Sequence, residues 1–185
     1  MVLAGDLDGG VPGVTEDPAV ADALLSAALE LARQVGGVGR VLLFHPPEAE
    51  AQLTSRSLGF RLWPADGDTA GKRYANAFRQ AGELGYEGAL VLGVDAAAIP
   101  ADRVAEAAAL LEKHQGVLVP DGRGGIALLG LQGAEPTMFP NGQGVPDVES
   151  IRTRARQQLV RLHELPPIET LTAETVGDFL AARHA

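Results

Sequence analysis

Three polar residues follow apolar segments whose composition is typical of buried strands. Asp95 comes directly after the run GALVLGV, and Asp121 and His45 follow two further apolar runs. In open α/β sheets, ligands bind beyond the carboxyl ends of the strands, so these positions predict a candidate site. A carboxylate at Asp95 reaches a metal ion or a ligand hydroxyl from such a position. Cation or polar-ligand binding is the chemistry that this position favours.

Both aspartates also have a structural interpretation. Asp95 caps the next helix or braces its loop in that case. Asp121 opens the Gly-rich turn Asp121-Gly122-Arg123-Gly124-Gly125. Such a turn lets a backbone approach a ligand closely, or supplies positive φ for a hairpin. Position in the sequence leaves both interpretations open.

A third candidate lies at the start of a predicted helix. Gly67 and Asp68 are followed by Gly71, Lys72 and Arg73. The amides and two cations at this helix start are suited to an anion, although a solvated helix start has the same composition. The spacing is not a phosphate-loop signature, and the sequence contains no G-x-x-x-x-G-K-[ST] motif.

The composition excludes several classes of function. A net charge of −9 without a Lys/Arg block argues against nucleic-acid binding. The absence of cysteine excludes disulfides, thiolate zinc sites and cysteine nucleophiles, and suits the cytoplasm. No apolar run approaches the ~20 residues that span a bilayer. The four histidines lack metal-ligand spacing, and no serine has the surroundings of a nucleophile elbow. An acidic protein that handles a phosphorylated ligand needs a divalent cation between its carboxylates and the phosphates.

The elements that must position these residues alternate along the chain. Strands are predicted at Met1–Ala4, Arg40–Phe44, Phe60–Trp63, Gly88–Val94, Gly116–Val119, Ile126–Leu131 and Leu162–Leu165. Helices are predicted at Ala19–Val35, Glu48–Leu58, Gly71–Leu84, Ala101–His114, Asp147–Arg161 and Ala173–Ala182. This alternation predicts one domain over residues 1–185, a three-layer α/β/α sandwich with a mainly parallel, mixed sheet. The fully apolar segment Gly88–Val94 is expected at its centre.

Four motifs between Gly67 and Leu131 have the order and spacing of a known family. They are Gly67-Asp68-Thr69-Ala70-Gly71-Lys72-Arg73-Tyr74, Gly93-Val94-Asp95-Ala96-Ala97, Pro120-Asp121-Gly122-Arg123-Gly124-Gly125 and Leu128-Leu129-Gly130-Leu131. These motifs resemble a bacterial family of glycosyltransferase-like proteins called selenodomain-associated transferases, a domain of unknown function. The resemblance implies the nucleotide-diphospho-sugar transferase fold. The closing D-x-D-T-x-x-D-L motif of that family would be Pro167-Ile168-Glu169-Thr170 and then Asp178-Phe179.

The resemblance also implies a site and its ligands. Asp95 and Asp121 would be the catalytic residues and would hold Mg²⁺ or Mn²⁺ against a nucleotide or nucleotide sugar. Pro12 and Gly13, which remain of the first loop of the family, and the motif residues Gly71, Lys72 and Arg73 would contact that ligand, helped by the inserted Arg123.

Departures from the family pattern mark this chain as a diverged member. The basic first loop of the family is reduced to Pro12-Gly13, with no Lys or Arg before Arg33. The tyrosine of the D-G-G-Y motif is lost to an insertion of Arg and Gly. Two functions from different classes follow: a metal-dependent nucleotidyl- or glycosyltransferase, or a catalytically inactive descendant that serves as a binding or assembly module. A hydrolase on another doubly wound sheet lacks a visible nucleophile–base pair.

Overall fold

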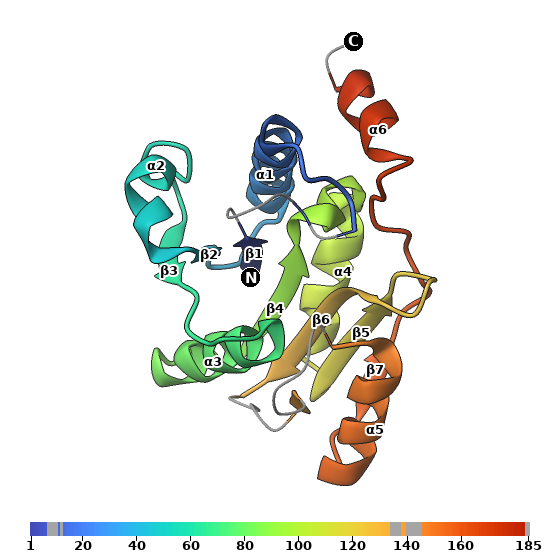
Figure 1. Ribbon diagram of the computed structural model, residues 1–185. Coiled ribbons are helices and arrows are strands. Elements are labelled where there is room, and N and C mark those ends of the chain that lie inside the picture. Colours follow the sequence, from blue (N-terminus) through green and yellow to red (C-terminus); the bar gives the residue numbers. More distant parts are fainter. Residues whose placement is uncertain (7–10, 12, 134–137, 140–145, 184–185) are drawn as a thin grey trace.

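The computed structural model describes residues 1–6, 11, 13–133, 138–139 and 146–183. A seven-stranded sheet runs through it in the order β3-β2-β1-β4-β6-β5-β7 (Figure 1). The strands are β1 (Val2–Asp6), β2 (Val41–His45), β3 (Arg61–Pro64), β4 (Gly88–Gly93), β5 (Gly116–Pro120), β6 (Ile126–Gln132) and β7 (Leu162–Glu164). Strands β1 to β4 pair in parallel, β5 is parallel to β7, and β6 is antiparallel to both β4 and β5. The mainly parallel, mixed sheet is confirmed.

Strand β4 lies at the centre of the sheet, as predicted. Its side chains alternate between the two faces because successive residues of a strand point in opposite directions. Leu90 and Leu92 join the core on one face, and Ala89 and Val91 join the core on the other. All four are buried. An apolar run without polar interruption is therefore what a strand covered on both faces requires.

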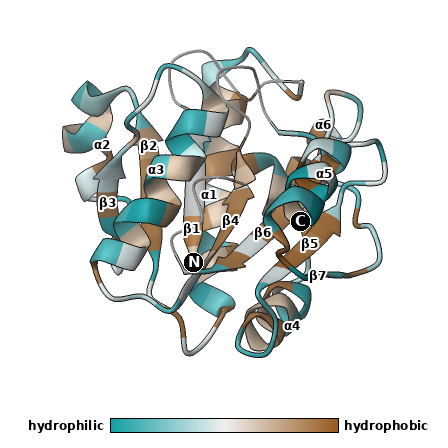
Figure 2. Cartoon of the chain, turned by 90° about the horizontal axis from the view of Figure 1, so that it is seen from below, coloured by the Kyte–Doolittle hydropathy of each residue, from teal (hydrophilic) through white to brown (hydrophobic). Residues whose placement is uncertain are grey.

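Helices cover both faces of the sheet and complete three layers. The first core contains residues of α1 (Pro18–Gln34), α2 (Glu50–Thr54), α4 (Ala101–Leu111) and α6 (Val176–Ala182). The second contains residues of α3 (Ala70–Glu83) and α5 (Val148–Gln158). Figure 2 shows brown, apolar strands between helices that carry teal, hydrophilic segments. The α/β/α sandwich is confirmed. No helix in the described part of the chain is long and apolar enough to cross a membrane.

Three helices begin where the sequence offers a capping side chain. Asp17 accepts a hydrogen bond from the amide of Ala19 at the start of α1, at 2.9 Å. Thr69 caps α3, and Asp147 accepts from the amide of Ser150 in α5 at 2.7 Å. These oxygens satisfy amides that have no partner within the helix, and so they fix where each helix starts.

Three predicted elements differ from the structure. The helix predicted over Glu48–Leu58 is a 3₁₀ turn, η1 (Pro47–Ala49), followed by the short α2. The terminal helix starts at Val176, because the hydroxyl of Thr175 accepts from the amide of Thr172 and holds a turn before it. The strand predicted over Gly88–Val94 ends at Gly93, because Val94 begins a 3₁₀ helix, η2 (Val94–Ala98).

The candidate site lies at the edge of the sheet where the ends of β4, β5 and β6 meet. Because β6 is reversed, the carboxyl ends of β4 and β5 lie beside its amino end. Residues 165–171, which we call the C-terminal strap, run along this edge. The amides of Leu165, Ile168 and Leu171 donate to the carbonyls of Leu118, Pro120 and Asp95 at 3.0, 2.9 and 3.0 Å. These bonds carry the strap from β5 to the end of β4.

Candidate functional site

Asp95 lies just past β4, in the first turn of η2. Its carboxylate folds back over Gly93, the last residue of the strand. A Cβ atom at Gly93 would overlap Oδ1 of Asp95. The backbone of Gly93 is extended, with φ −81°, so glycine is needed here for space and not for an unusual conformation. The sequence pair Gly93–Asp95 thus seats the carboxylate against the end of the central strand.

Several groups act on the charge of Asp95. Burial raises the pKa of Asp95 above that of an ordinary aspartate, and the nearby charge of Asp121 raises it further. A hydrogen bond from Thr170 and the charge of Arg123 lower the pKa in part. The two predicted aspartates are therefore close enough to repel each other. The surroundings of Asp95 thus disfavour its charged form, which is common at functional sites.

Asp121 organises the turn between β5 and β6. Its Oδ1 accepts hydrogen bonds from the amides of Arg123 at 2.7 Å and Gly125 at 2.8 Å. The carbonyl of Gly125 in turn accepts from the amide of Asp121 at 2.9 Å. Gly122 and Gly124 have positive φ, which this turn requires. The hairpin interpretation of the glycines is confirmed. The other oxygen, Oδ2, lies 3.8 Å from Nη2 of Arg123, beyond hydrogen-bond distance.

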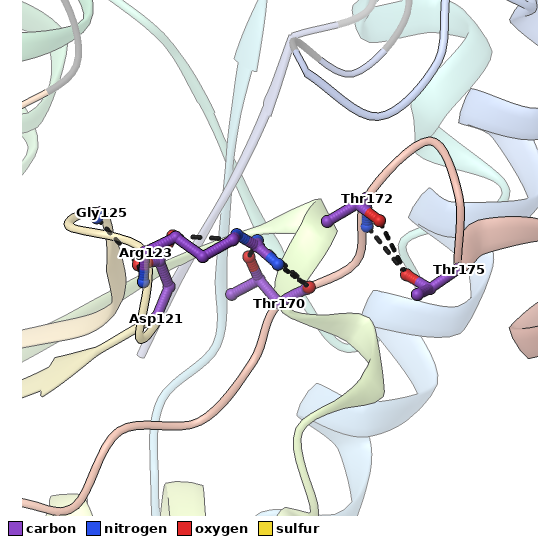
Figure 3. Close-up of polar contacts among 6 residues, drawn as sticks. All are labelled: Asp121, Arg123, Gly125, Thr170, Thr172 and Thr175. Atoms are coloured by element: carbon purple, nitrogen blue, oxygen red, sulfur yellow. Dashed lines mark hydrogen bonds and ion pairs between the residues drawn. The ribbon is translucent and has the colours of Figure 1, made fainter.

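Arg123 and Thr170 connect the turn to the strap. Figure 3 shows the arginine extending from the turn to Thr170. Nη1 and Nη2 both donate to the carbonyl of Thr170 at 3.2 Å, and Nη2 donates to its hydroxyl at 2.9 Å. Thr170 is buried, and hydrogen bonding from its side chain lowers the pKa of Asp95. The strap therefore places Thr170 between the Gly-rich turn and the end of β4, where the amide of Leu171 donates to the carbonyl of Asp95 at 3.0 Å.

Thr170 was not among the predicted site residues. Its place in the D-x-D-T motif was the signal that pointed to it. Contact with Asp95 depends on the path of the strap, which the local pattern around Thr170 does not reveal.

The other residues predicted to contact a ligand lie at the start of α3 and in the Gly-rich turn. Lys72 pairs with Asp68 at 2.8 Å, and Nε of Arg73 donates to the carbonyl of Gly67 at 3.0 Å. These contacts stabilise the start of α3, where Gly71 is buried. Arg123 is the cation that lowers the pKa of Asp95. A role for the start of α3 in ligand binding stays a prediction.

Three further positions were singled out in the sequence. Pro12 lies outside the described residues. Gly13 is exposed with φ +75°, and a Cβ there would have no atom within 4 Å. His45 ends β2, and its Nδ1 is a buried atom with no hydrogen-bond partner in the described part of the chain.

The comparisons with known proteins identify a family. Residues 26–143 match the bacterial family DUF2064, described as an uncharacterized protein conserved in bacteria. The chain belongs to this family. Membership of DUF2064 agrees with the predicted resemblance to a domain of unknown function, and the selenodomain-associated name is not tested by it. No protein with a curated description matches the sequence of this DUF2064 chain.

Solved structures share the fold of this DUF2064 protein. A protein from Desulfovibrio desulfuricans G20, provisionally assigned as a nucleotide-diphospho-sugar transferase, is 17% identical with a TM-score of 0.79, over 97% of this chain and 84% of that one. A 4-diphosphocytidyl-2C-methyl-D-erythritol synthase is 12% identical with a TM-score of 0.68, over 97% and 96%. A Mycobacterium tuberculosis H37Rv protein in complex with manganese is 13% identical with a TM-score of 0.62, over 98% and 97%. These likenesses show the nucleotide-diphospho-sugar transferase fold alone.

The carboxylates of this DUF2064 protein suit a hard divalent cation. Mg²⁺ and Mn²⁺ prefer oxygen ligands, and Mg²⁺ is commonly held by one or two carboxylates, with water and substrate phosphates completing its shell. Strands β4 and β5 are separated by β6, so their main chains are about 10 Å apart. Asp95 and Asp121 flank that gap. Oδ2 of Asp121 is too far from Arg123 for a hydrogen bond. The described residues include no group of three His, Cys, Asp or Glu that could hold a metal. Water or a ligand would complete the shell.

A groove opens beside the Gly-rich turn. Its volume is about 610 Å³, and it is lined by Arg123, Gly124, Gly125, Pro146, Asp147, Val148, Glu149 and Arg152. Neither Asp95 nor Asp121 is among these residues. The expectation that both carboxylates open onto one pocket stays a prediction.

Proposed function

We propose that this DUF2064 protein is a metal-dependent nucleotidyl- or glycosyltransferase that acts on a nucleotide or nucleotide sugar. The observation that carries the proposal is the pair of interacting carboxylates, Asp95 and Asp121, at the carboxyl ends of β4 and β5. Ligands of open α/β sheets bind at this edge. Proteins of the same fold include a synthase of a diphosphocytidyl compound and a manganese complex, which supports a nucleotide and a metal as ligands.

The side chains have distinct roles in this proposal. Asp95 and Asp121 hold Mg²⁺ or Mn²⁺, which neutralises charge on the leaving phosphate when it is bound. Arg123, whose side chain is 45% exposed, offers donors to phosphate oxygens from the rim of the groove. The main chain of the Gly-rich turn can approach the ligand closely at Gly124, where a Cβ would have no atom within 4 Å. In this proposal, the rest of the nucleotide contacts Pro12, Gly13, Gly71, Lys72 and Arg73.

One observation favours a second candidate, a non-catalytic descendant that binds a ligand or assembles with a partner. The cations that would meet phosphates already have protein partners: Lys72 pairs with Asp68, and Arg123 donates to Thr170. A nucleotide brings several negative charges to a protein of net charge −9. Losing one charge-assisted hydrogen bond costs about 1.5–3 kcal/mol, roughly ten- to hundredfold in affinity.

Calorimetric titration with a panel of nucleoside triphosphates and nucleotide sugars, with and without Mn²⁺, separates the two candidates. The transferase proposal predicts binding that requires Mn²⁺ and weakens at least about tenfold in Asp95→Ala. Asp102→Ala, which removes an exposed aspartate of α4, is the control and should bind as the parent does. Tight binding without metal, or binding indifferent to Asp95→Ala, would mean that the site lies elsewhere. No binding to any nucleotide favours the non-catalytic descendant.

A further inference from the structure

The guanidinium of Arg123 lies where its positive charge acts on both candidate metal ligands. Nη2 is 3.8 Å from Oδ2 of Asp121. On the other side, the guanidinium donates to the Thr170 hydroxyl at 2.9 Å, and the next residue of the strap, Leu171, donates its amide to the carbonyl of Asp95 at 3.0 Å. The positive charge of Arg123 therefore partly neutralises the two carboxylates that would hold a divalent cation.

The Arg123 side chain can leave this position without unfolding the turn. The turn is held by the main-chain amides of Arg123 and Gly125, which donate to Asp121, and not by the guanidinium. The side chain is 45% exposed, so a path to solvent is open. Its hydrogen bonds to Thr170 are what hold it inward.

We propose that Arg123 competes with the divalent cation for the carboxylates of Asp95 and Asp121, and that metal binding releases the guanidinium from Thr170. This inference rests on the proposed metal site. Two cations beside the same pair of carboxylates repel each other, and the guanidinium is the one with a path outward. Release removes the hydrogen bonds of Arg123 to the strap, which is then held by its main-chain bonds to Leu118, Pro120 and Asp95.

Competition of this kind couples two parts of the molecule. A metal ion that loosens the strap must itself bind more weakly when the strap is held, because coupling free energy is reciprocal. Arg123 therefore lowers the metal affinity of the site. Its release on metal binding loosens residues 165–171. A ligand phosphate near the turn would meet a guanidinium freed by the metal, so metal and phosphate would favour each other.

Mn²⁺ affinity of the full chain tests the competition directly. Free Mn²⁺ is measured by electron paramagnetic resonance in titrations of the parent protein, Arg123→Gln and Arg79→Gln. Arg79 pairs with Glu83 on the exposed side of α3 at 2.7 Å, so Arg79→Gln removes the same charge and one ion pair away from the site. We expect Arg123→Gln to bind Mn²⁺ about tenfold more tightly than the parent, and Arg79→Gln to change affinity less than about threefold. Arg123→Lys keeps the charge but loosens the strap, so its Mn²⁺ affinity should lie between those of the parent and Arg123→Gln.

Hydrogen exchange of the strap provides the second readout. In the parent, Mn²⁺ should speed exchange of the Ile168 and Leu171 amides. In Arg123→Gln, exchange should already be fast without metal. Arg123→Lys, which cannot form the same two-oxygen contact, should also exchange faster without metal and is a second variant if Arg123→Gln folds poorly.

The outcomes separate this inference from the proposed function. Mn²⁺ binding that is equal in the parent and Arg123→Gln, with no change in strap exchange, overturns the competition and leaves the metal site standing. Absence of Mn²⁺ binding in the parent and in Arg123→Gln overturns both. An equal gain in Mn²⁺ affinity in Arg123→Gln and Arg79→Gln would mean that net charge alone causes the effect. That result would overturn the role of Arg123.

Discussion

Arg123 and Thr170 lie 47 residues apart in the sequence, and the guanidinium of the first bonds to both oxygens of the second. One donor is 2.9 Å from the hydroxyl, and two are 3.2 Å from the carbonyl. The contact joins the β5–β6 turn to the C-terminal strap. Because the amide of Leu171 donates to the carbonyl of Asp95 and the Thr170 side chain lowers the pKa of Asp95, the strap is a structural part of the candidate site.

Replacing Thr170 with valine should destabilise the protein while leaving its shape unchanged. Thr170→Val removes a buried hydroxyl that accepts from Nη2 of Arg123 and lowers the pKa of Asp95, while the guanidinium keeps its bonds to the carbonyl of residue 170. The expected loss is about 1–3 kcal/mol in the free energy of unfolding, measured by urea denaturation. Thr153→Val, on the exposed side of α5, is the control and should cost much less. A cost equal to that of the control would show that the hydroxyl contributes little.

Gly93→Ala should disrupt the site without removing a charge. The added methyl group would occupy the position of Oδ1 of Asp95 and force the carboxylate to another rotamer. We expect Mn²⁺ or Mn²⁺-nucleotide affinity to fall at least about tenfold in calorimetric titration. Gly36→Ala is the matched control, because a Cβ there has no atom within 4 Å. Unchanged affinity in Gly93→Ala would argue against Asp95 as a ligand.

Asp95→Asn should stabilise the metal-free protein at neutral pH. Burial raises the pKa of Asp95, which means that folding disfavours its charged form, and asparagine removes that charge at similar size. The melting temperature in the presence of a chelator should therefore rise, whereas Asp102→Asn at an exposed position should leave it nearly unchanged. A lower melting temperature would mean that hydrogen bonds to the carboxylate outweigh its burial.

The Glu164–Arg152 pair predicts a pH-dependent part of the stability. Arg152 donates to both oxygens of Glu164, at 3.0 and 2.7 Å, and these hydrogen bonds lower the pKa of Glu164. A lowered carboxyl pKa contributes stability above the usual value of about 4.3, and that contribution is lost as pH falls through the folded pKa. Glu164→Gln should cost less than about 1 kcal/mol at pH 7, since the pair is partly exposed.

Urea denaturation of the parent and Glu164→Gln at pH 7 and pH 3 measures this difference, which should shrink at the lower pH. The control is Glu83→Gln, which removes a single hydrogen bond within α3. A difference that grows at pH 3 would contradict the sign of the pKa change.

The architecture was readable from the sequence because its signals are local. Leu90 and Leu92 alternate with Ala89 and Val91 in one apolar run, and that pattern predicts a strand buried on both faces. Capping residues such as Asp17 likewise sit next to the helices they start. Boundaries were less predictable where a hydroxyl far from any periodic pattern decides them, as Thr175 does before α6.

Only part of the candidate site could be predicted from the sequence. The sequence alone determined that Asp95 and Asp121 follow strands and so lie at one edge of a sheet, because strand direction places carboxyl ends together. Tertiary structure decided which cation and hydroxyl accompany them. Lys72, a cation of the predicted anion site, pairs with Asp68 four residues before it, whereas the strap brings Thr170 to Asp95 from the far end of the chain. The order β4-β6-β5 and the long-range backbone bonds of the strap create that contact, and neither is encoded in the spacing of nearby residues.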